Sequence, residues 1–138
     1  MAVIEKLICT QADGSISFGN YQLAAKSKLD NFEHNGDLYK VKTYKELTKL
    51  EKNGMFAYES QPGTSVTDFQ ETEDGVTFLV EADEDAQITV GLKEDTEYSV
   101  IVGDANIGTM KTNLSGKLSI SVELESAGEI AVKIVKNG

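Results

Sequence analysis

The chain alternates apolar and polar residues without a break over Leu118-Ser119-Ile120-Ser121-Val122-Glu123-Leu124. Successive side chains of a β-strand point to opposite faces, so this period of two predicts a strand with one buried face. Short turns such as Glu73-Asp74-Gly75 favour antiparallel neighbours. We therefore expect residues 65–138 to form an antiparallel β-sandwich of the immunoglobulin-like class. The same alternation recurs at residues 76–81, 88–92, 98–102 and 130–134.

Residues 1–64 are predicted to form a β-rich region that carries one helix. Thr43 and Glu46 have the spacing of a capping box, and Asn53-Gly54 supplies a stop, so a helix is expected over residues 44–53. The sequence leaves open whether the two halves are separate small domains or one β-rich domain. Strand patterns in this half occur at residues 2–8, 15–23 (after an Asp13-Gly14 turn), 38–42 and 55–58.

The 138 residues carry a formal net charge of −10, and all 13 basic residues are lysines. Residues 1–64 are neutral overall, so the whole net charge belongs to residues 65–138, beyond Pro62-Gly63. An acidic chain without arginine lacks the basic surface and the guanidinium groups with which proteins contact phosphates and bases. Nucleic acid is therefore not an expected partner.

Other classes are disfavoured by what the sequence lacks. Cys9 is the only cysteine, which rules out an internal disulfide framework and a zinc site built from several cysteines. No apolar stretch approaches the roughly 20 residues of a membrane-spanning helix, and the first residues lack the pattern of a secretory signal. We expect no membrane span and a cytoplasmic location by default, with the cell surface after unconventional export as the alternative.

Two resemblances bear on function. Residues 86–135, through Thr96-Glu97-Tyr98-Ser99-Val100, Gly108-Thr109 and Gly116-Lys117-Leu118-Ser119, resemble accessory β-sandwich domains of bacterial carbohydrate-active and surface proteins. The whole chain resembles short proteins of anaerobic Gram-positive gut bacteria that are loosely labelled endosialidases. The second resemblance rests on Met1-Ala2-Val3-Ile4-Glu5-Lys6-Leu7-Ile8, Ile16-Ser17-Phe18-Gly19-Asn20-Tyr21, Asp37-Leu38-Tyr39-Lys40-Val41-Lys42-Thr43 and Lys52-Asn53-Gly54-Met55-Phe56.

The endosialidase label implies a chemistry that the residue content opposes. Sialic acid carries a carboxylate, which the arginines of a sialidase site hold with bidentate hydrogen bonds that an ammonium group cannot reproduce. This chain has no arginine, and its 138 residues are too few for the propeller of such enzymes. We therefore reject sialidase activity, and the resemblance implies a glycan-related or assembly role.

Calcium is the candidate metal. Glu81, Asp83 and Asp85 form a dense carboxylate loop at alternate positions, and calcium prefers hard oxygen ligands. The loop does not have the spacing of an EF-hand. The alternative is a solvated acidic loop that keeps the protein soluble, with no cofactor bound.

Carbohydrate is the candidate organic ligand. Sugar-binding surfaces stack aromatic faces on sugar rings, and without tryptophan this chain must use tyrosines. Tyr39, Tyr44 and Tyr58 lie within twenty residues of one another, so they are the candidate platform. The alternative is that they are core or half-buried strand residues.

No catalytic residues are assigned. The only histidine, His34, lacks an evident nucleophile and orienting acid. It is expected to be an exposed loop residue, and Cys9 a small buried thiol. A small hydrolase is the weakest alternative, in which Glu59 pairs with Glu5 or Asp68 as the two carboxylates of a glycosidase.

The lysines suggest a further role. Lys40, Lys42, Lys45, Lys49 and Lys52 follow one another closely, whereas residues 71–97 are strongly acidic. Complementary charged ends can dock copies of one chain into a ring or filament. The first functional prediction is therefore a non-enzymatic structural, assembly or surface-interaction protein, whose partner is itself or a glycan or protein surface. The alternative is a carbohydrate-binding module with a tyrosine platform, stabilised by calcium.

Overall fold

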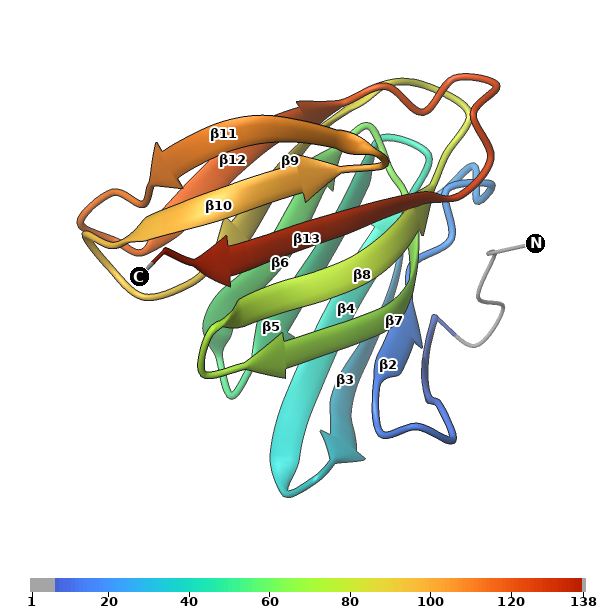
Figure 1. Ribbon diagram of the computed structural model, residues 1–138. Helices are drawn as coiled ribbons and strands as arrows, with labels where there is room; N and C mark the ends of the chain where they lie inside the picture. Colours follow the sequence, from blue (N-terminus) through green and yellow to red (C-terminus); the bar gives the residue numbers. More distant parts are fainter. Residues whose placement is uncertain (1–6, 138) are drawn as a thin grey trace.

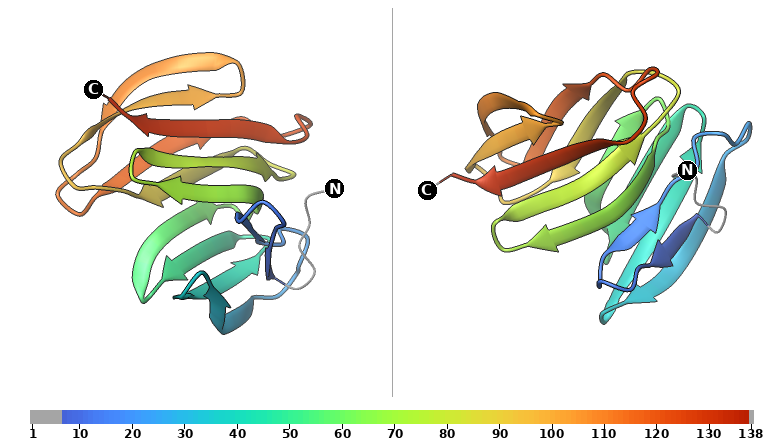
Figure 2. Two further views of the ribbon diagram at one scale, coloured as in Figure 1. Left: turned by 60° about the horizontal axis from the view of Figure 1, so that its bottom comes forward. Right: turned by 45° about the vertical axis from the view of Figure 1, so that its right-hand side comes forward.

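The computed structural model describes residues 7–137, which form thirteen strands and no helix. The strands build two antiparallel sheets that pack face to face (Figure 1, Figure 2). In chain order they are β1 (Ile8–Thr10), β2 (Ile16–Phe18), β3 (Ser27–His34), β4 (Asp37–Tyr44), β5 (Leu47–Lys52), β6 (Met55–Gln61), β7 (Ser65–Thr72), β8 (Gly75–Glu81), β9 (Ala86–Gly91), β10 (Glu97–Val102), β11 (Ala105–Lys111), β12 (Lys117–Val122) and β13 (Ile130–Lys136).

One sheet has seven strands in the order β1-β2-β7-β8-β13-β10-β11, and the other has six in the order β12-β9-β6-β5-β4-β3. The expectation of a mainly β, antiparallel protein is confirmed. Each sheet takes strands from both sides of residue 64, because β2 pairs with β7 and β6 pairs with β9. A division at residue 64 therefore crosses both sheets, and strands of the first half are part of the sandwich.

Aromatic side chains from the two sheets meet in the middle of the core. Tyr58 of β6 makes edge-to-face contacts with Phe18 of β2, at a centroid distance of 5.2 Å, and with Phe78 of β8, at 5.6 Å. Phe69 of β7 packs against Phe18 and Phe78. Burying each such side chain contributes about 1.5–3 kcal/mol, so this cluster binds the sheets and the two halves of the chain together.

The helix expected over residues 44–53 is wrong, because this segment contains β5, which pairs with β4 and β6. Tyr44 lies opposite Leu47, so residues 45–46 form a tight hairpin turn. Thr43 does not cap a helix: its Oγ1 accepts the backbone N–H of Asn20 at 2.8 Å and lies 2.8 Å from Oγ1 of Thr48. Pairing on both sides and a buried inward face outweigh the local helix signals.

The first predicted strand, residues 2–8, lies mostly outside the described residues, and β1 begins at Ile8. The Asp13-Gly14 turn is confirmed, since it joins β1 and β2 as a hairpin, but the strand expected over residues 15–23 is limited to β2. No segment of residues 7–137 is a helix with the length and apolar character that crossing a membrane requires.

Candidate ligand-binding site

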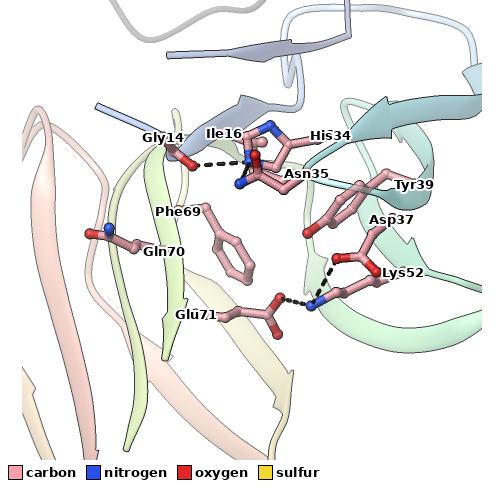
Figure 3. Close-up of a pocket in the computed structure, with 10 residues that line it drawn as sticks. All are labelled: Gly14, Ile16, His34, Asn35, Asp37, Tyr39, Lys52, Phe69, Gln70 and Glu71. Carbon is pink, nitrogen blue, oxygen red and sulfur yellow. Dashed lines mark hydrogen bonds and ion pairs between the residues drawn. The ribbon is translucent and has the colours of Figure 1, made fainter. Parts of the chain in front are cut away.

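A cavity of about 210 Å³ lies at the end of the sandwich where the β1–β2 and β3–β4 hairpins turn (Figure 3). Strands of both sheets contribute to it, so its walls depend on the sandwich as a whole. Polar side chains dominate the lining. The lining residues are Gly14, Ile16, His34, Asn35, Asp37, Tyr39, Lys52, Phe69, Gln70 and Glu71.

Tyr39 places a hydroxyl in this cavity. The side chain lies on the inward face of β4 and is only 5% exposed, and Figure 3 shows its hydroxyl pointing into the open space. Burial raises the pKa of this hydroxyl, so it is protonated at neutral pH and can donate as well as accept. Within residues 7–137 it forms no hydrogen bond, which leaves it free for a ligand.

Lys52 carries the positive charge of the cavity. Its Nζ lies 3.4 Å from Oε1 of Glu71 and 3.7 Å from Oδ2 of Asp37. Burial acts to lower the pKa of Lys52, but the nearby Glu71, Tyr39 and Asp37 outweigh it and the pKa is raised. With one ammonium and two carboxylates, the three charged groups carry a net charge of −1, which disfavours an anionic ligand.

His34 is not the exposed loop residue that the sequence suggested. It is the last residue of β3 and is only 9% exposed. Its Nε2 donates to the carbonyl oxygen of Gly14 at 3.0 Å, so in the neutral ring Nδ1 accepts the hydroxyl of Thr10, also at 3.0 Å. The imidazole therefore ties the β1–β2 turn to β3, and its edge contact with Tyr39 helps to fix that ring.

The sequence contains a signal for this site at Asn35-Gly36, which lies outside every element and candidate site predicted from it. Asn35 and Gly36 both have positive φ, 53° and 84°, and form the two-residue turn between β3 and β4. Asn-Gly between two strands is a strong hairpin signal. With this turn recognised, the alternation along β4 places Tyr39 on the inward face, next to His34.

The predicted platform of three tyrosines does not form. Tyr58 is fully buried, its Oη lies 2.7 Å from Oγ1 of Thr64, and burial raises its pKa strongly. Tyr44 is half-buried at the end of β4, where Lys26 lies over its ring. Tyr39, Tyr44 and Tyr58 thus point into three different environments, and Tyr39 alone lines the cavity of Figure 3.

The three acidic residues expected to bind calcium, Glu81, Asp83 and Asp85, lie in different surroundings. Oδ1 of Asp85 accepts the backbone N–H groups of Leu124 and Glu125, at 2.9 and 3.0 Å. The charge of Glu81 adds to burial in raising the pKa of Tyr21. Asp83 is exposed. Among residues 7–137, no group of three or more His, Cys, Asp and Glu side chains is arranged to hold a metal ion.

The five lysines lie on a sheet instead of a helix. Lys40 and Lys42 are on β4, Lys49 and Lys52 are on β5, and Lys45 is in the turn between them. Strand register sets Lys42 directly opposite Lys49. Lys52 does not belong to this outer surface, because it turns inward to the cavity of Figure 3.

A row of three lysines is thereby formed across the outer face of the six-stranded sheet. Lys28 of β3 lies opposite Lys42, which lies opposite Lys49; we call these three residues the lysine row. Lys49 has an ion pair with Glu51 at 3.8 Å. Lys28 and Lys42 form no ion pair with any residue in the described range 7–137.

The remaining catalytic candidates are not brought together. Glu59 on β6 and Asp68 on β7 belong to different sheets, and Glu5 lies outside the described residues. Cys9 is half-buried in β1, and its Sγ lies 3.7 Å from Nε2 of Gln11.

Comparison with known proteins gives this chain no relative: no protein-family model, no curated protein and no solved structure matches it. Both resemblances drawn from the sequence, to endosialidase-labelled proteins and to accessory β-sandwich domains, therefore stay predictions. Function is accordingly inferred from the geometry of the residues.

Proposed function

We propose that this protein is a non-enzymatic interaction module that holds one neutral sugar ring in the cavity of Figure 3. The observation that carries this proposal is the unused hydroxyl of Tyr39, which points into a cavity beside Lys52, Asp37 and Glu71. A sugar hydroxyl both donates and accepts, so it matches a wall that offers donors and acceptors at close range. The volume of about 210 Å³ is smaller than that of a drug-sized pocket, which begins at about 300 Å³.

The charge of the cavity selects among sugars. An acidic sugar brings a carboxylate toward Asp37 and Glu71, and the single ammonium of Lys52 is already paired with both. Without arginine, the chain has no bidentate partner for that carboxylate. A neutral ligand avoids this repulsion. This selectivity supports our rejection of sialidase activity.

The same geometry supports a binding role over a hydrolytic one. A glycosidase holds the scissile bond between two carboxylates. Between Asp37 and Glu71, however, stands Lys52, at ion-pair distance from both (Figure 3). Both ring nitrogens of His34 are engaged in holding Thr10 and the β1–β2 turn. We therefore assign no catalytic role to these residues.

Titration of the protein with neutral and acidic monosaccharides tests this proposal. We expect glucose, galactose or mannose to shift the NMR signals of residues around Tyr39, and glucuronate and sialic acid to shift them far less. Tyr39→Phe removes only the hydroxyl, and loss of one hydrogen bond weakens binding about tenfold. Tyr44→Phe is the matched control and leaves affinity unchanged. If no neutral sugar shifts these signals, or if Tyr39→Phe binds as the wild type does, the proposal is wrong.

Self-assembly is a second proposal, and the lysine row favours it. Like charges directly opposite one another destabilise a sheet, so Lys28 and Lys42, which have no ion pair in the described range, have a cost that an acidic partner surface relieves. A second copy offers such a surface, because its residues 65–138 carry the whole net charge of −10.

The finer expectation of an immunoglobulin-like sandwich remains a proposal too, supported by the two antiparallel sheets.

Light scattering at low and at high salt tests assembly. We expect oligomers at low salt that dissociate at high salt, since salt screens contacts between exposed charges. Lys42→Gln should weaken the association, whereas Lys133→Gln, which changes an exposed lysine of the other sheet, is the matched control. A strict monomer under both conditions contradicts the proposal.

A further inference from the structure

A second cavity lies next to the first. Its volume is about 360 Å³, and Lys52 and Glu71 line both cavities, so their ion pair stands at the boundary. Beyond this pair the character of the wall changes from polar to apolar. The second cavity is lined by Lys52, Asn53, Met55, Phe56, Ala57, Glu71, Gly91, Leu92 and Ser115.

Three residues shape the apolar wall. The side chain of Met55, directly after the Asn53-Gly54 turn, is 72% exposed, so it covers no core and is free to contact a ligand. Gly91 allows β9 to approach the backbone of Phe56 closely at this wall, because a Cβ at this position would clash with the carbonyl oxygen of Phe56. The ring of Phe56 packs under Nζ of Lys117, 4.5 Å from its centroid, which holds it in place.

We propose that the two cavities are two subsites for one amphipathic ligand, a neutral glycoside with an apolar aglycone. The sugar ring occupies the polar cavity at Tyr39, and the aglycone crosses the Lys52–Glu71 pair to lie against Met55 and Leu92. The pair is only partly buried and solvent-screened, so a ligand can displace it at low cost. This inference rests on the proposed function, because the position of the sugar orients the aglycone.

Matched pairs of glycosides test it. Methyl and n-hexyl β-glucoside, β-galactoside and α-mannoside are titrated into the intact protein, with 1-hexanol as a probe without a sugar. We expect the methyl glycosides to shift NMR signals around Tyr39 only. The hexyl glycosides should also shift those of Met55, Ala57 and Leu92, and should bind at least about tenfold more tightly, since each buried methylene adds to affinity.

A variant pair gives a second readout. Met55→Ser should reduce the affinity for the hexyl glycoside and leave that for the methyl glycoside unchanged. Leu114→Ser is the matched control, because Leu114 is 81% exposed and does not line the second cavity. Since both side chains are exposed, neither substitution should unfold the protein.

The outcomes separate the two proposals. If methyl glycosides bind at Tyr39 and the hexyl chain adds neither affinity nor shifts at Met55, the second subsite is wrong and the proposed function stands. If no glycoside shifts the signals of Tyr39, the proposed function is wrong and this inference is overturned with it. If hexanol alone reproduces the effect of the hexyl glycoside, the second cavity binds apolar groups independently, which also overturns a joint site.

Discussion

The closed middle of the sandwich and its open end each contain an inward-facing tyrosine of the six-stranded sheet. In the middle, Tyr58 is enclosed by rings of the opposite sheet, and its hydroxyl is hydrogen-bonded to Thr64. At the end, Tyr39 is nearly as buried, yet within the described residues its hydroxyl has no hydrogen-bond partner and faces a cavity. The same residue type therefore serves the core in one region and remains available in the other.

The difference shows how a sandwich can hold a site without disturbing its core. Buried polar groups in the middle must be satisfied by neighbours, as the chain of hydroxyls from Tyr58 through Thr64 to Ser60 illustrates. At the end, hairpin turns replace the opposite sheet as the wall, and a polar group can face solvent or ligand. A hydroxyl at this end is thus free to bind a ligand, because the fold does not require it to form a hydrogen bond within the protein.

The largest expected effect comes from truncating the central ring. Tyr58→Ala should lower the free energy of unfolding by about 4 kcal/mol, because it leaves a cavity among Phe18, Phe69 and Phe78. Tyr39→Ala should cost clearly less, because its ring already borders a cavity. Urea denaturation of both variants measures this difference. Equal costs would show that the end of the sandwich is packed as tightly as the middle.

Removing only the hydroxyl of each tyrosine should give a smaller difference in the free energy of unfolding, and one that reports on hydrogen bonding alone. Tyr58→Phe should lower the free energy of unfolding by about 1.5 kcal/mol, since Thr64 loses a buried hydrogen bond. Tyr39→Phe should change it by less than about 0.5 kcal/mol, since no bond is lost. The same urea experiment applies. A large cost for Tyr39→Phe would mean that its hydroxyl has a structural partner and is not reserved for a ligand.

The strands of this fold could be predicted where one face is buried and the alternation is long. The C-terminal strands β8, β9, β10, β12 and β13 follow that pattern closely. The segment that became β5 could not be predicted in the same way, because Thr43 and Glu46 imitate a capping box and Leu47 and Leu50 fit a helical face as well as a sheet. Residues 47–52 form a strand because they pair with β4 and β6 on both sides. A local sequence pattern does not show this pairing, so it favours the helix.

The site was harder to predict than the fold. Sequence proximity suggested that Tyr39, Tyr44 and Tyr58 converge, but strand parity and position separate them. Glu71 is distant in sequence from Tyr39 and Lys52, and only the packing of the two sheets brings it to the cavity. A site built between sheets depends on this long-range arrangement. Residue types and spacing singled out Tyr39 and Lys52, but as parts of a tyrosine platform and of a charged assembly surface, and not as neighbours in one cavity.

The ion pairs of Lys52 at the open end should make a modest, pH-dependent contribution to the free energy of unfolding. The folded pKa of Lys52 is raised, so its ion pairs stabilise the fold below the unfolded pKa of about 10.4, and this contribution is lost as the pH rises through the folded pKa. Lys52→Met should therefore lower the free energy of unfolding by less than about 1 kcal/mol at neutral pH, since the pair is partly exposed. Once the pH exceeds the raised folded pKa of Lys52, the two proteins should converge in stability. A difference that persists there would point to packing of the lysine stem instead.

The smallest expected effect is spectroscopic and compares the two tyrosines directly. Burial raises the pKa of both hydroxyls, and that of Tyr58, fully enclosed, far more. In an alkaline titration followed by tyrosinate absorbance, Tyr39→Phe should remove a fraction that ionises somewhat above the ordinary pH of about 10, while the fold persists. Tyr58→Phe should remove a fraction that appears only as the protein unfolds. If both fractions appeared together with unfolding, the end of the sandwich would be as closed to solvent as its middle, and the cavity would not admit a ligand.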